Sequence, residues 1–275
     1  MKSARENNGR SSQNRDGLRV KKVSDITRAI SMCVYGRSGS GKTTFAATAP
    51  GPILYVDIRD EGTASISDVK GLDVFEVEAF ADIEEIYWWL HKNPKKYKTV
   101  ILDTVSQLQG MIVQEVAGNN KKGKRAGDWG SMTKKDWGDV AAVMKEWLGN
   151  YRDLTAKGIN VIFIAQDRTF NLSDEEEAND SLLAPEIGPA LSPAVAKSLN
   201  ASVSVLANTF IREITKVKEI NGKKIKKGVI QYCLGVGPSP IYTRKLRKPK
   251  RVTAPDAIVD PSWEDVVEIM KGNVE

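Results

Sequence analysis

Eight residues near the start of the chain have the types and spacing of a phosphate-binding loop. The segment Gly36-Arg37-Ser38-Gly39-Ser40-Gly41-Lys42-Thr43 fits the pattern G-x-x-x-x-G-K-[ST]. Glycines let the backbone curl so that its N–H groups point at phosphate oxygens, and a helix beginning near Lys42 adds its N-terminal dipole. The pattern therefore predicts a nucleotide site that runs through Thr44. In it, Lys42 supplies positive charge to the β- and γ-phosphates, and the Thr43 hydroxyl binds Mg²⁺.

A carboxylate that could serve the same metal follows a second apolar run. Residues 99–102 (TVIL) predict a buried strand, and Asp103 comes directly after it. Carboxylate oxygens suit Mg²⁺, so we predict that Asp103 holds the ion through water and that Thr104 lines the site. The alternative is that Asp103 caps the helix that follows.

Hydrolysis also needs a group that activates or orients water. Asp57, Asp60 and Glu61 lie at or just beyond the end of the apolar run 53–58, where ligands approach an α/β sheet. Glu61 is the preferred general base, and the alternative is a solvated loop acid. Gln166, just after the apolar run 161–165, is a candidate sensor of the γ-phosphate, or else an ordinary loop glutamine.

The elements that must position these residues alternate along the chain. Buried strands are predicted at 30–35, 53–58, 73–77, 99–102 and 161–165, and amphipathic helices at 81–92, 105–116 and 138–156. This alternation predicts an α/β fold with a mostly parallel sheet flanked by helices. Strand-only segments after residue 200, near 201–207, 210–218, 229–236 and 241–243, predict an antiparallel extension near the C-terminus. They include a hairpin over 210–232 with its turn at Asn221-Gly222. A last helix is predicted at 262–270, with a capping pair Ser262 and Asp265.

Composition limits the class of protein. The chain has 275 residues, a formal net charge of +6 and two cysteines 200 positions apart. No apolar run reaches the ~20 residues of a membrane helix, so we expect a cytoplasmic protein without a membrane partner. Residues 1–24 are polar and predict a disordered tail, followed by one domain over 25–275.

Positive charge is concentrated in two regions. Residues 212–251 hold thirteen Lys and Arg against two acids, and a second basic group lies at Lys121, Lys122, Lys124 and Arg125. Such concentration favours a polyphosphate partner, because neutralised phosphates release counterions. The alternative is a solvated surface. An acidic run occupies residues 174–177.

The order of these motifs resembles the RecA-like branch of P-loop ATPases. The chain is similar in particular to phage-type nucleotide-binding proteins of single-strand DNA annealing and recombination. The resemblance spans about residues 26–270. It depends on GRSGSGKTT, LYVDIRDEGT, YKTVILDTVSQL, KDWGDV, VIFIAQ and YTRKLR, in that order.

The resemblance implies further roles. It assigns Glu61 as the catalytic base and Gln166 as the residue that couples nucleotide state to DNA. It also implies that Lys245 and Arg247 reach the ATP of an adjacent subunit in a ring or filament. The DNA-binding loop then falls at 117–135, whose basic group and Trp129 suit tracking and stacking on single strands. The second DNA loop of the family corresponds to the acidic segment 167–185, which departs from the pattern.

The expected function is that of a DNA-dependent ATPase of RecA-like fold. It would use ATP and Mg²⁺, bind single-stranded DNA, form homo-oligomers and act in phage-type recombination or strand annealing, in the host cytoplasm if phage-encoded. A single-strand-binding protein is a further partner on family grounds. Two alternatives stay open: a nucleotide-gated DNA-binding module with little hydrolysis, and a P-loop kinase of a small substrate.

Overall fold

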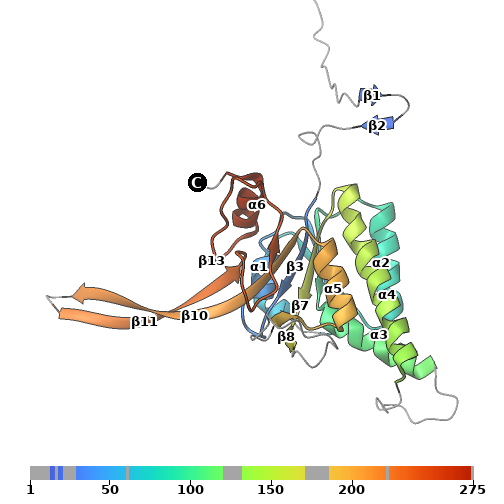
Figure 1. Ribbon diagram of the computed structural model, residues 1–275, viewed down its shortest axis with the longest axis horizontal. Helices are drawn as coiled ribbons and strands as arrows, with labels where there is room; N and C mark the ends of the chain where they lie inside the picture. Colours follow the sequence, from blue (N-terminus) through green and yellow to red (C-terminus); the bar gives the residue numbers. More distant parts are fainter. Residues whose placement is uncertain are drawn as a thin grey trace, which may run out of the picture.

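The computed structural model describes residues 13–15, 18–20, 29–59, 62–119, 132–170, 186–220 and 223–273. In this part of the chain, nine strands form one sheet with helices on both faces (Figure 1). The path through the sheet is β13-β11-β10-β3-β7-β6-β4-β5. The strands on it are β3 (Ser31–Tyr35), β4 (Ile53–Asp57), β5 (Leu72–Glu76), β6 (Thr99–Asp103), β7 (Asn160–Ala165), β10 (Val205–Ile220), β11 (Lys223–Gly235) and β13 (Ala257–Val259).

The sheet is parallel from β5 to β10 and antiparallel beyond it. Strand β10 runs parallel to β3, whereas β11 and the short β12 (Lys245–Leu246) pair with β10 in the antiparallel sense. Strand β13 then pairs antiparallel with β11. The predicted fold class, a mostly parallel sheet with an antiparallel C-terminal extension, is confirmed.

Alternate residues of the central strands feed two separate cores. Cys33 and Tyr35 of β3 belong to one buried cluster, while Met32 and Val34 belong to the other. The period of two in a strand sends neighbouring side chains to opposite faces, and a central strand covered on both sides is apolar throughout. The first cluster is covered by α2 (Phe80–Lys92), α3 (Val105–Asn119), α4 (Lys134–Asp153) and α5 (Pro193–Ser202). The second is covered by α1 (Lys42–Ala46), the 3₁₀ turn η2 (Gly62–Ile66) and α6 (Trp263–Lys271).

The helix starts follow from local chemistry. The Ser262 side chain accepts a hydrogen bond from the Asp265 N–H, and Asp265 bonds back to Ser262, so the predicted capping pair opens α6. The same arrangement of Thr133 and Asp136 opens α4. No helix in the described ranges is long and apolar enough to cross a membrane.

Several segments differ from the sequence prediction, including the short strands β12 and β13, which were not predicted. The helix α5 was not predicted: Ser192 and Pro193 open it, since proline fits the first turn of a helix. The predicted strands 201–207 and 210–218 are one strand, β10, that starts at Val205. The predicted loop 167–190 contains two paired strands, β8 (Asp167–Phe170) and β9 (Glu186–Pro189). In the predicted strand 241–243 only Tyr242 forms a bridge, to Ile187.

The N-terminal segment contains one paired element. Within residues 1–24, strands β1 (Gln13–Arg15) and β2 (Leu18–Val20) form a two-stranded antiparallel pair apart from the main sheet. The rest of the predicted tail lies outside the described residues.

Candidate nucleotide site

The predicted phosphate loop connects β3 to α1 and has the required backbone. Gly41 is the N-cap of α1 and has φ +91°, a left-handed conformation that favours glycine. Gly36 lies so close to β10 that an added Cβ would be 2.5 Å from the carbonyl oxygen and the Oγ1 of Thr209. Ser40 and Thr209 share a hydrogen bond of 2.6 Å between their hydroxyls. The loop is therefore held against strand β10.

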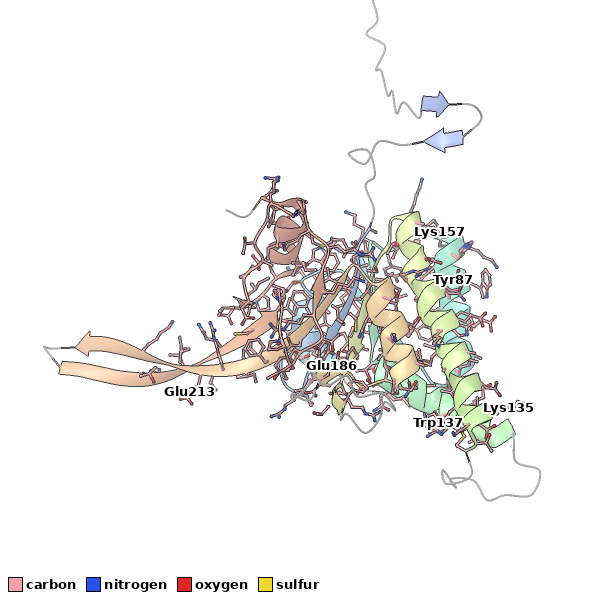
Figure 2. The ribbon with its side chains drawn as sticks, in the orientation of Figure 1. Tyr87, Lys135, Trp137, Lys157, Glu186 and Glu213 are labelled. Atoms are coloured by element: carbon pink, nitrogen blue, oxygen red, sulfur yellow. The ribbon has the colours of Figure 1, made fainter. Side chains whose placement is uncertain are left out.

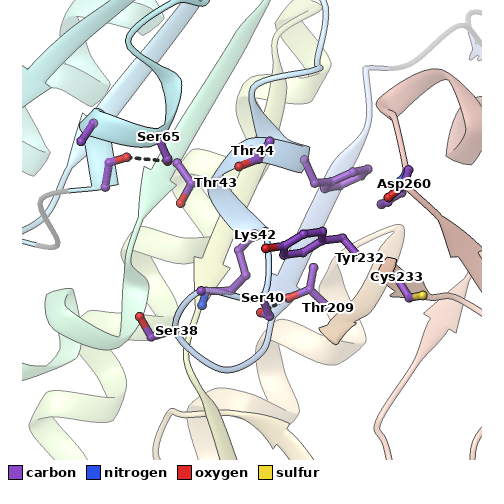
Figure 3. A pocket seen from close by; sticks show the side chains of 16 residues that line it. Ser38, Ser40, Lys42, Thr43, Thr44, Ser65, Thr209, Tyr232, Cys233 and Asp260 are labelled. Atoms are coloured by element: carbon purple, nitrogen blue, oxygen red, sulfur yellow. Dashed lines mark hydrogen bonds between the residues drawn. The ribbon is translucent and has the colours of Figure 1, made fainter. Parts of the chain in front are cut away.

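The side chain of Lys42 runs into the curve of this loop (Figure 3). Its Nζ donates hydrogen bonds to the carbonyl oxygens of Gly36, at 2.8 Å, and Arg37, at 2.9 Å. Lys42 is only 6% exposed. The ammonium group thus lies among the loop's own backbone groups, where the predicted phosphates would bind.

Thr43 and Asp103 meet, as the metal prediction requires. The Thr43 hydroxyl donates to Asp103 Oδ2 at 2.7 Å, and the Tyr55 hydroxyl donates to the same oxygen at 2.8 Å. Asp103 is fully buried at the end of β6. All three groups present hard oxygen atoms, which is the donor chemistry that Mg²⁺ prefers. The residues present therefore fit this ion.

A different residue caps the helix after Asp103. The N–H of Gln107 donates to Thr104 Oγ1 at 3.2 Å, and the N–H of Leu108 donates to the Thr104 carbonyl. This arrangement leaves the capping alternative for Asp103 without support and places Thr104 at the start of α3.

Strand β7 lies between the strand of the phosphate loop and the strand of Asp103. Gln166 follows β7, so it lies at the same edge of the sheet, between the two motifs. Its N–H donates to Ser106 Oγ at 3.1 Å. Asp57, buried at the end of β4, stands opposite Asp103 in the strand register. The structure thus brings Lys42, Asp103 and Gln166 to one edge.

The predicted base Glu61 and its neighbour Asp60 lie outside the described residues. The chain on either side is described. Gly62 lies against the hydrogen-bonded cluster of Thr43, Tyr55 and Asp103. An added Cβ would be 2.7 Å from the Tyr55 hydroxyl and 3.5 Å from Asp103 Oδ2 and Thr43 Oγ1. Glu61 is therefore the sequence neighbour of a residue in contact with this cluster.

Lys245 and Arg247 lie elsewhere in the subunit. Lys245 Nζ donates to the carbonyl oxygens of Asn200 and Ala201, both at 2.8 Å, at the C-terminal end of α5. Arg247 Nη2 approaches the Ala201 carbonyl at 3.5 Å. Burial and the neighbouring Arg247 lower the pKa of Lys245. Within one chain both side chains bind a helix end, and their reach to a neighbouring subunit's ATP stays a prediction.

The predicted DNA-binding residues Lys121, Lys122, Lys124, Arg125 and Trp129 lie outside the described residues. The same is true of the acidic run 174–177. Their assignment stays a prediction.

Sequence reasoning missed the wall of the site opposite the phosphate loop. A cavity of about 630 Å³ is bounded on one side by residues 38–45 and on the other by residues from η2, β10, β11 and the segment 260–261 (Figure 3). The Tyr232 ring lines it: an added Cβ on Gly41 would be 3.3 Å from Tyr232 Cδ1. Tyr232 is 45% exposed. Its place beside the loop depends on the β10–β11 pairing, and no sequence motif marks it.

Comparison with known families identifies the chain. The sequence model of the AAA_24 family, described as an AAA domain, matches residues 28–247. The chain belongs to the AAA_24 family. The described part of this AAA_24 protein has a mostly parallel sheet with β7 between the phosphate-loop strand and the Asp103 strand. No curated protein sequence matches it significantly.

Two solved structures are similar to this AAA_24 protein over most of their length. One is a KaiC-like protein from the hyperthermophilic archaeon Pyrococcus horikoshii OT3, with a TM-score of 0.42 and 11% identity, covering 85% of this chain and 90% of that one. The other is the flagellar accessory protein FlaH from Methanocaldococcus jannaschii, with a TM-score of 0.41 and 11% identity. It covers 86% of this chain and 92% of that one.

Proposed function

We propose that the protein is a Mg²⁺-dependent ATPase whose turnover responds to single-stranded DNA. The observation that carries the ATPase part is the meeting of Thr43 and Asp103 at 2.7 Å beside a phosphate loop that holds Lys42. The phosphate loop follows β3 and Asp103 ends β6, and β7 lies between these two strands in the sheet. The contact between Thr43 and Asp103 therefore depends on the fold as well as on the loop motif.

Each residue has a specific part in this proposal. Backbone N–H groups of residues 38–44 and the Lys42 ammonium bind the phosphates, and Thr43 and Asp103 hold the metal. Bound Mg²⁺ supplies positive charge that neutralises the phosphate oxygens. Glu61 accepts a proton from the water that attacks the γ-phosphorus, and the bond from that phosphorus to the bridging oxygen breaks to release ADP.

The base of the nucleotide has a binding surface in the same cavity. The exposed Tyr232 ring faces the space beside Gly41 and offers an apolar plane to a purine. Stacking of a base on an aromatic side chain contributes about 1–3 kcal/mol. Tyr232 is therefore the proposed stacking residue for the adenine.

The DNA part of the proposal is supported by charge and by the family resemblance. Thirteen Lys and Arg between residues 212 and 251, with two acids, form a basic region that suits a polyphosphate partner. By resemblance, the protein assembles into a ring or filament in which Lys245 and Arg247 serve the neighbouring site. The process is recombination or strand annealing of the phage type, with a single-strand-binding protein as partner.

The test is ATP hydrolysis by the purified protein with and without an unlabelled single-stranded oligonucleotide, at low and moderate salt. DNA-stimulated turnover is the expected result. Absence of turnover, combined with DNA binding that changes with ATP, would replace the ATPase by a nucleotide-gated binding module. Turnover indifferent to DNA would reject the DNA part, and a screen of small phosphate acceptors would then test the kinase alternative.

A further inference from the structure

Strands β10 and β11 continue far beyond the sheet. The last residue of β10 that pairs with β3 is Asn208, and the strand runs on to residue 220. At about 3.3 Å per residue, these twelve residues span about 40 Å. Figure 1 shows the two strands leaving the body as a long ribbon. We name residues 211–220 and 223–232, which pair only with each other in the sheet, the arm.

The arm starts at the edge of the sheet that carries the nucleotide site. Strand β10 is parallel to β3, and the phosphate loop follows β3, so both leave the body at the carboxyl edge of the parallel strands. At its base, Thr209 touches Gly36 and Ser40, and Tyr232 lies against Gly41. The arm is thus joined directly to the phosphate loop.

The register divides the arm into two different faces. Directly opposed residues share a face, and the faces alternate along the strands. The pairs Arg212–Gln231, Ile214–Val229 and Lys216–Lys227 occupy one face, which we name the cationic face. The pairs Ile211–Tyr232, Glu213–Ile230 and Thr215–Gly228 occupy the other face, which we name the Tyr232 face. Because Tyr232 lines the nucleotide cavity, this face is the one turned toward the cavity.

Within residues 211–216 and 227–232, charge is segregated between these faces. Arg212, Lys216 and Lys227 are all exposed, and no carboxylate lies on the cationic face within residues 211–216 and 227–232. Glu213 projects on the other side, the lower side of the arm in Figure 2. Its carboxylate lies over Gly228, so a Cβ at position 228 would overlap the Glu213 carboxylate. The one acid in these ranges is therefore kept away from the cations.

The cations are also arranged at a cost to the fold. Lys216 stands directly opposite Lys227, and like charges in that position destabilise a strand pair. Arg212 is held by a 2.8 Å bond from its Nε to Gln231 Oε1 and keeps its exposed position. Arg212, Lys216 and Lys227, with the aliphatic Ile214 and Val229 between them, therefore form a row of positive charge. Such a row is complementary in charge to a polyanion that lies along the arm.

We propose that the cationic face of the arm binds the phosphate backbone of single-stranded DNA. This inference depends on the proposed function and places its DNA surface on the arm, outside the loop at 117–135. Nucleotide and DNA then bind opposite faces of the same two strands.

The test compares two triple variants that each remove three positive charges. One is R212Q/K216Q/K227Q on the arm. The control is K92Q/K95Q/K96Q, whose exposed lysines lie at the last residue of α2 and in the segment before β6, at the opposite edge of the sheet. The probe is a fluorescein-labelled 30-residue oligo-dT, titrated by anisotropy with a non-hydrolysable ATP analogue at several KCl concentrations. Circular dichroism and thermal unfolding confirm that each variant is folded.

The arm variant is expected to bind the oligonucleotide roughly tenfold more weakly at moderate salt. Its plot of log affinity against log salt is expected to be less steep than that of the wild type by about 2, which is about 0.7 for each lost phosphate contact. The charge-preserving variant R212K/K216R/K227R should bind like the wild type, and so should the control. An arm variant that binds like the wild type, or a control that loses as much, overturns the inference and leaves the DNA-dependent ATPase standing.

Failure of the proposed function looks different. In that case the wild type does not bind the oligonucleotide in any nucleotide state, and the arm inference fails with it. Sedimentation of the wild type and the arm variant then tests the competing occupant, a second copy of this chain. A change of oligomeric state in the arm variant alone would assign the cationic face to subunit contact.

Discussion

The Tyr232 ring lies against Gly41, the residue that precedes the lysine of the phosphate loop: a Cβ at Gly41 would be 3.3 Å from Tyr232 Cδ1. The two residues are 191 positions apart in the sequence. The contact places the base of the arm beside the nucleotide cavity.

Tyr232→Ala should weaken ATP binding by roughly tenfold, because removing an aromatic stacking surface costs about 1–3 kcal/mol. Tyr232→Phe keeps the ring and should bind nearly as well as the wild type. Isothermal titration with ATP measures both. The matched control is Ile230→Ala, on the same face and 64% exposed, which should leave the affinity unchanged. Equal affinities for the alanine variant and the wild type would remove Tyr232 from the base site.

Lys42→Ala should reduce turnover by about 10²-fold or more, since it removes a buried positive charge from the phosphate site. Arg37 contributes its carbonyl oxygen to Lys42 while its side chain is exposed, so Arg37→Ala should have a much smaller effect. Steady-state ATP hydrolysis compares the two variants, and circular dichroism checks their folding. A folded Lys42→Ala protein with normal ATP affinity and turnover would contradict the site.

Asp103→Asn should lower turnover by about 10²-fold and make ATP binding nearly independent of Mg²⁺. The substitution keeps the size of the side chain and removes the charge that we propose holds the metal. ATP affinity measured with Mg²⁺ and with EDTA gives the comparison. Asp73→Asn serves as control, because Asp73 is an exposed carboxylate on β5 that accepts a hydrogen bond from the Tyr97 hydroxyl. If Mg²⁺ strengthened ATP binding as much in Asp103→Asn as in the wild type, the metal assignment would be wrong.

Gly62→Ala should reduce turnover about tenfold and destabilise the protein by about 1–3 kcal/mol, because the new methyl group would overlap the buried Tyr55 hydroxyl. Tyr55 must then move away from Asp103. Turnover and thermal unfolding are the measurements. At Gly110, in the middle of α3, an added Cβ meets no atom within 4 Å, so Gly110→Ala should stabilise the protein by about 0.5–1 kcal/mol and leave turnover unchanged.

Lys245 and Arg247 should differ in stability. Lys245→Met removes two charge-assisted bonds to the end of α5 and should cost about 1–3 kcal/mol of unfolding free energy, whereas Arg247→Ala removes one long contact and should cost less.

Arg247→Ala should lower turnover while ATP binding stays intact. Mixing it with Lys42→Ala protein should restore part of the activity if sites are shared between subunits. No recovery on mixing would contradict the shared site.

The residues of the candidate phosphate site could be named from the sequence. The pattern that ends in Lys42 and Thr43, and the apolar strand that ends in Asp103, depend on local composition alone. Gly39 and Gly41 have left-handed backbone conformations, and Gly36 lies where a Cβ would overlap Thr209, so glycine is the residue that each position favours. The capping pair Ser262 and Asp265 is a local signal of the same kind and was also predicted correctly.

Other features depended on which strands become neighbours. The β10–β11 hairpin was predicted over 210–232, but the length of β10 was not, because the sequence divided it into the pieces 201–207 and 210–218. The helix α5 was missed because its ten residues contribute only three buried apolar positions, Val195, Ala196 and Leu199. Tyr232 and Thr209 reach the nucleotide site because β10 pairs with β3. The cationic face exists because the register opposes Lys216 to Lys227.

The sequence by itself determined the chemistry, namely a phosphate loop, a carboxylate after a buried strand and a basic C-terminal region. The tertiary structure alone decided which groups surround that chemistry. The physical reason is that a motif is encoded by the backbone preferences of adjacent residues. Pairing between distant strands, in contrast, is chosen by burial of their apolar faces over the whole sheet, and this choice placed Tyr232 beside Gly41.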